Sequence, residues 1–219
     1  MKFGGTSVGS AQRMKGVASL INDGEDKIVV LSAMSGTTNS LVEICGYLAN
    51  NNPEGANEVI NKLDTLYRRH INELFSTEEY KQQTLSLVRE VFNYLRSFTK
   101  QLFTSVEERI ILAQGEIIST NMVTNYLKEQ GISAHLIAAL DYMRTDKNGE
   151  PDATYIKEKL TDVLASSPKA QIYITQGFIC RNINGEIDNL QRGGSDYTAS
   201  LIGAAIGASE IQIWTDIDG

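Results

Sequence analysis

Short apolar strands alternate with helical segments along the whole chain, and this alternation restricts the fold more than any other feature. Buried strands are predicted at residues 27–33 and 171–176, because runs such as Ile28-Val29-Val30-Leu31 leave no polar side chain for a solvent-facing side. Further strands are predicted at 134–138 and 210–214, with helices between them. Strands connected through helices pair in parallel and are covered on both faces. We therefore expect an α/β fold with a mainly parallel central sheet.

Glycine- and hydroxyl-bearing turns follow several of these strands. Residues 4–10, 32–39 and 215–216 each come directly after a predicted strand. Ligands of open α/β sheets bind beyond the carboxyl ends of the strands. A hydroxyl that caps the next helix, as we expect for Ser10, explains one or two of these side chains but not the whole cluster. The turns indicate a ligand site at one edge of the sheet. Phe178, which follows the predicted strand at 171–176, either lines the pocket or fills the core.

The segment Arg192-Gly193-Gly194-Ser195-Asp196 combines the parts of an anion-binding corner. The glycine pair lets the backbone approach a ligand closely. The helix predicted at 196–207 offers free N–H groups and the positive end of its dipole. Ser195 and Asp196 stand where N-cap residues stand, and Arg192 carries a planar set of donors that matches a carboxylate or phosphate. The alternative is an ordinary loop with a capped helix and a surface arginine.

The amino-terminal stretch Lys2-Phe3-Gly4-Gly5-Thr6-Ser7 indicates a strand that turns through a phosphate-cradling loop. Lys2 would act as a point charge for a phosphate, and Ser10 would cap a helix over 11–22. The stretch lacks both the Gly-Lys-Ser/Thr ending of a Walker A loop and the Gly-x-Gly-x-x-Gly spacing of a dinucleotide site. A dinucleotide-dependent dehydrogenase is therefore disfavoured, and a simple start and turn is the alternative for this stretch alone.

A helix predicted at 105–130 carries a glycine and a carboxylate in its apolar middle. Glycine inside a helix costs about 1 kcal/mol relative to alanine, so Gly115 indicates that another segment approaches closely. A buried carboxylate needs a partner. For Glu116 this is either the ammonium group of a ligand or a cation of the protein, Arg109 or Lys128.

A helical insert is predicted at about 53–104, packed on the domain or on a partner. Apolar residues recur there at helical spacing, which is typical of a core-facing stripe and not of a cofactor site. The stripe consists of Val88, Val91, Phe92, Leu95, Phe98 and Leu102. Capping boxes are predicted at 76–79 and 105–108.

The charge balance limits the kinds of partner. The 219 residues carry a net charge of −7, with a pI near 4.9. A nucleic-acid or membrane-surface binder needs a basic field and is disfavoured. Cys45 and Cys180 are the only cysteines, which suggests neither a disulfide framework nor a zinc cluster. With no apolar run near 18 residues and no signal peptide, we expect a cytoplasmic protein.

Six stretches form an ordered set, at 2–7, 32–39, 114–116, 175–178, 192–199 and 214–216. The set resembles the motif series of the aspartokinases, which are members of the amino acid kinase family. The Lys-Phe-Gly-Gly-Thr and Arg-Gly-Gly-Ser-Asp motifs are its most specific parts, and the resemblance covers essentially the whole chain. It implies an αβα sandwich that transfers the γ-phosphoryl group of ATP to the β-carboxylate of L-aspartate. The product would be 4-phospho-L-aspartate, the entry to lysine, threonine and methionine.

The resemblance also implies a role for each motif residue. Lys2 would steady the transferring phosphoryl group and Asp196 would hold Lys2 in place, while Arg192 would pair with a carboxylate and Glu116 with the ammonium group of aspartate. The residues implied to surround aspartate are Ser32, Thr38, Glu116, Phe178, Arg192 and Ser195. Those implied to line or contact the nucleotide are Lys2, Gly4, Gly5, Thr215 and Asp216.

The implied chemistry needs little from the protein beyond positioning. A carboxylate nucleophile is already ionised at neutral pH, so no general base is required. Positioning and charge neutralisation then carry the reaction. The implied catalytic residues are Lys2, Arg192 and Asp196, and the implied cofactors are ATP and Mg²⁺, an ion that takes few protein ligands of its own.

The sequence departs from the aspartokinase pattern at both ends. Only Met1 precedes Lys2, where the family has a few apolar residues, and the chain stops at Gly219, where the family continues through the nucleotide site into ACT domains. We therefore expect a carboxyl-terminally incomplete catalytic domain that is poorly active alone, from a parent protein that is a homo-oligomer. Alternatives are a kinase of glutamate, N-acetylglutamate, carbamate or a nucleotide, and a non-catalytic ligand-sensing or assembly module.

Overall fold

A parallel sheet forms the centre of the molecule. The computed structural model describes residues 1–190 and 193–215, and five strands within these ranges pair in the order β3-β4-β2-β1-β7. Their bounds are Lys2–Phe3 (β1), Lys27–Leu31 (β2), Ala134–Leu136 (β3), Ile172–Gln176 (β4) and Ile213–Trp214 (β7). Every neighbouring pair is parallel. The predicted parallel sheet is confirmed, although β2, β3 and β7 are shorter than the predicted 27–33, 134–138 and 210–214.

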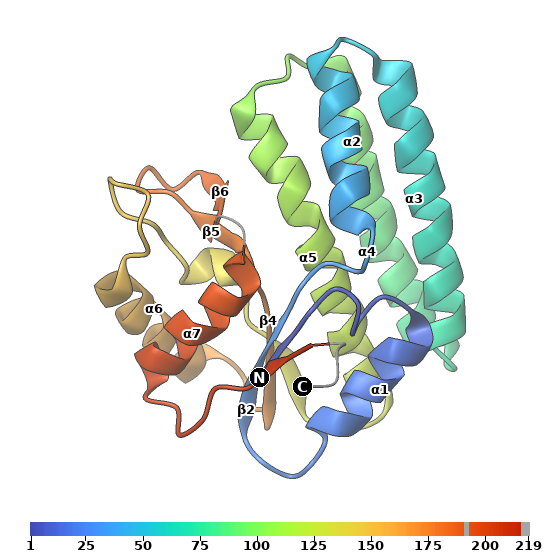
Figure 1. The fold of residues 1–219 in the computed structure, drawn as a ribbon. Helices are drawn as coiled ribbons and strands as arrows, with labels where there is room; N and C mark the ends of the chain where they lie inside the picture. The colour runs from blue at the N-terminus through green and yellow to red at the C-terminus, as the bar shows by residue number, and fades with distance from the viewer. Residues whose placement is uncertain (191–192, 216–219) are drawn as a thin grey trace.

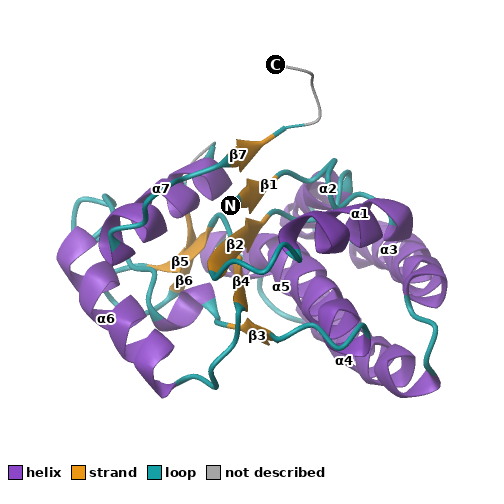
Figure 2. Ribbon diagram, turned by 90° about the horizontal axis from the view of Figure 1, so that it is seen from below, coloured by secondary structure: helices purple, strands orange, loops and turns teal. Residues whose placement is uncertain are grey.

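Helices cover both faces of this sheet. They are α1 (Ala11–Ile21), α2 (Thr37–Ala49), α3 (Pro53–Leu74), α4 (Glu78–Ser97), α5 (Ser105–Glu129), α6 (Ala153–Ser166) and α7 (Gly194–Ile206). Figure 2 shows the sheet nearly edge-on, with α6 and α7 on one side and α1 to α5 on the other. The αβα sandwich is therefore confirmed.

The strand β2 shows why both faces must be covered. Its side chains point alternately to the two faces. Val29 and Leu31 belong to the core beneath α1 to α5, whereas Val30 belongs to the second core beneath α6 and α7, and all three are fully buried. An apolar run without alternation is thus divided between two separate cores, as expected for a central parallel strand.

An antiparallel hairpin lies beside the sheet on the α6–α7 side (Figure 1). Its strands are β5 (Ile179–Arg181) and β6 (Ile187–Asn189), and Ile179 pairs with Asn189. The chain leaves β4, forms this hairpin and then enters α7. Two 3₁₀ turns complete the elements, at Phe98–Lys100 (η1) and Ala139–Asp141 (η2).

The predicted helical insert forms the long antiparallel pair α3–α4, which stands beside α2 and α5 (Figure 1). Val88, Phe92 and Leu95 are buried as predicted. Leu102, predicted on the same apolar face, is 84% exposed. That prediction was wrong because α4 ends at Ser97 and the helical spacing does not continue to residue 102. The treatment of 53–104 as an insert in one catalytic domain stays a prediction.

Several helix starts differ from those predicted. The box at 76–79 does not form: the N-cap of α4 is Thr77, one residue later, and its side chain accepts no N–H of the helix. The Thr77 hydroxyl donates instead to Glu129 Oε1 at 2.7 Å. A capping box does open α5, but it begins at Thr104, one residue early. Ser10 caps α1 as predicted, accepting from the Arg13 N–H at 3.2 Å. None of the helices in the described ranges has the length and hydropathy to cross a bilayer.

Candidate active site

The register of the sheet brings the carboxyl ends of four strands into line. Phe3 pairs with both Leu31 and Trp214, and Leu31 pairs with Gln176. Because parallel strands run in one direction, the residues that follow these partners leave the sheet at the same edge. Those residues are Gly4, Ser32, Gly177 and Thr215.

A cavity of about 340 Å³ opens at this edge. Its wall comes from five separate segments and includes most of the residues that the sequence motifs indicate. These are Lys2, Gly5, Ser32, Thr38, Glu116, Phe178, Ser195 and Asp196. The structure therefore brings together residues that are up to 194 positions apart, from Lys2 to Asp196.

Two of the predicted site residues that the structure describes are not in this wall. A Cβ atom on Gly4 would lie 3.5 Å from Lys2 Nζ, so Gly4 adjoins the cavity without lining it. Thr215 follows β7 at the same edge of the sheet but does not line the cavity. Arg192 and Asp216 lie outside the described residues.

One ion pair lies in the wall of the cavity. Lys2 Nζ, from β1, lies 2.8 Å from Asp196 Oδ1, in the first turn of α7. The Lys2 side chain is largely buried, whereas that of Asp196 is 54% exposed. An ion pair with so exposed a partner adds little stability. Its consequence is geometric, because it fixes the ammonium group of Lys2 at the cavity.

Glu116 is the buried charge of the site. Its side chain is almost inaccessible to solvent, and Oε1 accepts the Ala33 N–H at 3.2 Å. Oε2 has no hydrogen-bond partner among the described residues. Burial raises the pKa of this carboxyl to about 7. Arg109, predicted as one alternative partner, lies 3.3 Å from Asp188 instead. A cation supplied by a ligand would satisfy the open oxygen.

Gly115 explains how Glu116 reaches the cavity. A Cβ atom at this position would lie 2.7 Å from Ala33 Cβ and 3.3 Å from Thr37 Cγ2. The missing side chain thus lets α5 pack directly against the turn at 32–39. The close approach predicted from a glycine in mid-helix is confirmed.

The opposite wall is equally tight. Ser32 Oγ donates to Ser195 Oγ at 3.0 Å, which joins the end of β2 to the first turn of α7. A Cβ atom on Gly177 would lie 2.4 Å from Ser195 Oγ and 2.9 Å from Ser195 Cα. Gly177 was given no role of its own in the sequence prediction. The signal that could have revealed it is a glycine placed directly after a buried strand.

Phe178 has an unusual backbone conformation. Its φ is +69°, in the left-handed region that residues other than glycine seldom adopt. The conformation is held from both sides: the Phe178 N–H donates to Thr198 Oγ1 at 3.2 Å, and its carbonyl accepts the Leu190 N–H at 2.7 Å. Phe178 lines the cavity and also packs against the core beneath α6 and α7, so both predicted alternatives apply. Backbone strain of this kind is typical of functional sites.

Two helices begin at the cavity. Gly36 and Gly193 are the N-caps of α2 and α7, each with φ of +84°, and neither helix start has a side-chain cap. The prediction that Ser195 and Asp196 act as N-caps was wrong, because both already lie in the first turn of α7. Uncapped N–H groups and the positive ends of the helix dipoles favour an anion.

The cavity therefore offers complementary features to a small zwitterion. Lys2 and the two helix starts favour negative charge, and Glu116 favours a cation. Across 1–190 and 193–215, no group of three or more His, Cys, Asp or Glu side chains is arranged to hold a metal ion. The geometry suits recognition of an amino acid beside an anionic group.

Comparisons with known proteins show which proteins the chain is similar to. The chain is 34% identical to chloroplastic aspartokinase 1 of Arabidopsis thaliana and 34% identical to lysine-sensitive aspartokinase 3 of Escherichia coli K12, over 100% of this chain in both cases. It covers 40% and 49% of these relatives, and thus spans about half the length of the curated relatives it matches. The crystal structure of E. coli aspartokinase III with aspartate and ADP superposes with a TM-score of 0.83 at 29% identity, covering 100% of this chain and 49% of that one.

The family model for the "Amino acid kinase family" matches residues 1–219, which is every residue of the chain. The sheet order, the two helical layers and the cavity at the carboxyl edge all lie within this matched range. The chain therefore belongs to the amino acid kinase family.

Proposed function

We propose that this chain is the aspartate-binding part of an aspartate kinase, an ATP-dependent enzyme that phosphorylates the β-carboxylate of L-aspartate. One observation carries the proposal: a buried carboxylate with an open oxygen, Glu116, shares a cavity of about 340 Å³ with a fixed ammonium group, Lys2. The former selects an ammonium group, and the latter suits a transferring phosphoryl group. Three aspartokinases among the relatives, each 34% identical to the chain, support the choice of substrate.

In this proposal an oxygen of the β-carboxylate attacks the γ-phosphorus of ATP. The new O–P bond forms as the bond to the β,γ-bridging oxygen breaks, and ADP leaves with the electron pair. No proton has to move, because the nucleophile is ionised at neutral pH. Lys2, held by Asp196, neutralises charge on the phosphoryl group as it passes between the two oxygens.

The remaining residues orient the amino acid. Glu116 binds the ammonium group, and the hydroxyls of Ser32, Thr38 and Ser195 bind the carboxylates together with Arg192. Phe178 closes the cavity on its apolar side. Gly4 and Gly5 line the phosphates, and Thr215 and Asp216 contact the nucleotide. A site that holds the nucleophile and the phosphoryl group close together and aligned would gain much of its rate enhancement from positioning.

Mg²⁺ fits the donor set of this cavity. The ion binds through nucleotide phosphates and water, with one or two carboxylates at most. Among the described residues, the cavity wall contains two carboxylates, Glu116 and Asp196. Because Glu116 is reserved for the ammonium group of the amino acid, the exposed Asp196 is the one that could bind the ion. When bound, the ion would neutralise the phosphates of ATP.

Calorimetric titration of the chain with L-aspartate, succinate and ATP-Mg²⁺ tests the proposal. We expect L-aspartate to bind and succinate, which lacks the ammonium group, to bind at least about tenfold more weakly, as for a ligand that leaves a buried polar group unpaired. A preference for L-glutamate or N-acetyl-L-glutamate would assign another substrate. Binding of neither amino acid nor nucleotide would favour a non-catalytic assembly module.

Phosphoryl transfer is a separate measurement. An acyl phosphate formed from aspartate reacts with hydroxylamine, so the product can be trapped as a hydroxamate. The expectation that the 219-residue chain alone is a poor kinase stays a prediction, and ordinary rates of hydroxamate formation would contradict it. The homo-oligomeric state of the parent protein is likewise part of the proposal.

A further inference from the structure

A buried hydrogen bond connects the α3–α4 pair to the wall of the cavity. The Tyr67 hydroxyl, on α3, lies 2.8 Å from Thr37 Oγ1, at the first residue of α2. Both side chains are almost inaccessible to solvent. Tyr67 does not line the cavity, and its part of the sequence carries no motif, so any effect on the ligand must pass through Thr37.

Thr37 stands at a junction of three segments. It lies between Gly36 and Thr38, which both line the cavity. Its N–H donates to the Met34 carbonyl at 3.0 Å and closes the turn before α2. Its methyl group faces Gly115, where a Cβ atom would come within 3.3 Å. The turn and the helix that carries Glu116 therefore meet at this side chain.

Tyr67 is itself held firmly. Its ring packs against Phe92 of α4, with 5.8 Å between the ring centroids and 54° between the planes. Burial, together with the nearby negative charge of Glu116, raises the pKa of Tyr67 above its usual range. The hydroxyl is therefore protonated at neutral pH. Loss of this group would leave a buried Thr37 hydroxyl without its partner. This costs more free energy than replacing both hydroxyls with apolar groups.

We propose that Tyr67 is a positioning residue of the site, whose hydrogen bond to Thr37 holds the turn at 32–39 against Glu116 in its ligand-binding shape. The α3–α4 pair then supports the wall of the cavity and also contributes side chains to the hydrophobic core. The identity of the ligand as aspartate rests on the proposed function. The positioning role itself concerns the shape of the turn and can be measured without a ligand.

The chain provides a matched control. Tyr142 and Thr175 form a second buried Tyr–Thr hydrogen bond, 2.7 Å long, and both side chains are fully buried. The described neighbours of Thr175, Ile174 and Gln176, lie outside the cavity wall. Tyr67→Phe and Tyr142→Phe thus remove the same group from the same kind of pair, and general loss of stability should be similar in both.

The first test is amide hydrogen exchange of the ligand-free chain, followed by mass spectrometry. We expect Tyr67→Phe to speed exchange in peptides covering 32–39 by about tenfold, the change produced by roughly one lost hydrogen bond. Tyr142→Phe should leave these peptides unchanged. Unaltered exchange in Tyr67→Phe, or equal acceleration in both variants, would overturn the positioning role.

The second test separates this role from simple destabilisation. Tyr67→Phe should raise the Kd for aspartate about tenfold and leave the Kd for ATP-Mg²⁺ unchanged, and Thr37→Val combined with Tyr67→Phe should add nothing further. Additive effects, or equal losses for both ligands, would contradict the proposal. If the unaltered chain binds no aspartate, the proposed function fails, and the exchange experiment still decides the role of Tyr67.

Discussion

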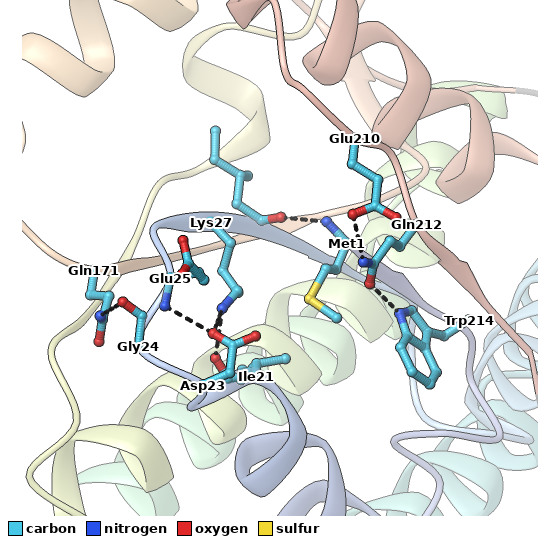
Figure 3. Close-up of polar contacts among 11 residues, drawn as sticks. Met1, Ile21, Asp23, Gly24, Glu25, Lys27, Gln171, Glu210, Gln212 and Trp214 are labelled. Atoms are coloured by element: carbon cyan, nitrogen blue, oxygen red, sulfur yellow. Dashed lines mark hydrogen bonds and ion pairs between the residues drawn. The ribbon is translucent and has the colours of Figure 1, made fainter.

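The two edges of the central sheet each carry a cavity, but their polar groups are arranged in opposite ways. The cavity at the amino edge is the larger, about 480 Å³ against 340 Å³ at the carboxyl edge. Around it the polar groups bond to one another (Figure 3). Lys27 is bonded to Asp23, Gln212 Nε2 donates to Glu210 at 3.0 Å, and Trp214 Nε1 donates to Gln212 at 3.0 Å.

At the carboxyl edge Lys2 pairs with Asp196 and Ser32 with Ser195, but other polar groups keep open bonding capacity. Glu116 keeps one buried oxygen without a partner among the described residues, and the helix starts at Gly36 and Gly193 have no side-chain caps. Burying a polar group without a hydrogen-bond partner costs free energy. Such a group is expected where a ligand supplies the missing partner. Polar groups without a hydrogen-bond partner therefore indicate the ligand site better than the volume of the cavity does. Three of the four predictions below change both edges in the same way, and the fourth follows the open carboxyl across pH.

The largest effect is expected from removing the charge of Glu116. Glu116→Gln should weaken aspartate binding by more than about a hundredfold, because breaking a buried charge pair costs about 3–5 kcal/mol. Glu210→Gln, a carboxylate at the amino-edge cavity, should leave aspartate affinity unchanged. Calorimetry with aspartate and succinate measures both. A Glu116→Gln variant that still prefers aspartate over succinate would mean that another group binds the ammonium.

The same carboxyl should make stability depend on pH. Its pKa is raised from 4.5 to about 7 in the folded chain, so its contribution to stability is complete below pH 4.5 and is lost as the pH rises through 7. The free energy of unfolding of Glu116→Gln relative to the unaltered chain should therefore rise by about 3 kcal/mol between pH 4.5 and 8. Urea denaturation across this range measures the difference. Parallel curves for the two proteins would show that Glu116 is not buried in its charged form.

Glycines at the two edges allow a comparison of packing. A Cβ atom on Gly177 would lie 2.4 Å from Ser195 Oγ and 2.9 Å from Ser195 Cα, whereas one on Gly203, in the wall of the amino-edge cavity, would lie 2.4 Å from the tip of the Ile211 side chain. Gly177→Ala should cost about 1–3 kcal/mol of stability and displace Ser195, and with it aspartate. In Gly203→Ala the partly exposed Ile211 can turn aside, and the gain in helix propensity is up to about 1 kcal/mol. Urea denaturation and aspartate titration give both numbers. An equal loss of aspartate affinity in the two variants would show that aspartate does not bind beside Ser195.

Much of this arrangement could be predicted from local sequence patterns. The parallel sheet follows from apolar runs separated by helices, and the site edge follows from polar turns placed directly after strands. Gly115 and Glu116 could be predicted because a glycine and a carboxylate are both unusual in the apolar middle of a helix. These signals need no knowledge of which segments touch.

Features that depend on distant contacts could not be predicted. Tyr67 follows the same helical spacing as any core aromatic residue, and its bond to Thr37 depends on how α3 packs against α2. The start of α7 was predicted too late, at residue 196, because Ser195 and Asp196 suggested caps, whereas Gly193 with its positive φ occupies the N-cap position. The exposure of Leu102 follows from the end of α4 at Ser97, which the apolar spacing alone does not reveal.

The smallest effect is expected from exchanging the two lysines for methionine, which keeps the length of the stem and removes the charge. Lys2→Met should weaken ATP-Mg²⁺ binding by about tenfold, the value of one charge-assisted contact to phosphate, and should free Asp196. Lys27→Met removes the bonds to Asp23 and to the Ile21 carbonyl, so it should lower the melting temperature slightly and leave both ligand affinities intact. Calorimetry and thermal denaturation of the two variants measure these effects. Because both lysines are largely buried next to an aspartate, loss of nucleotide affinity in Lys27→Met as well would show that the two edges do not differ in function.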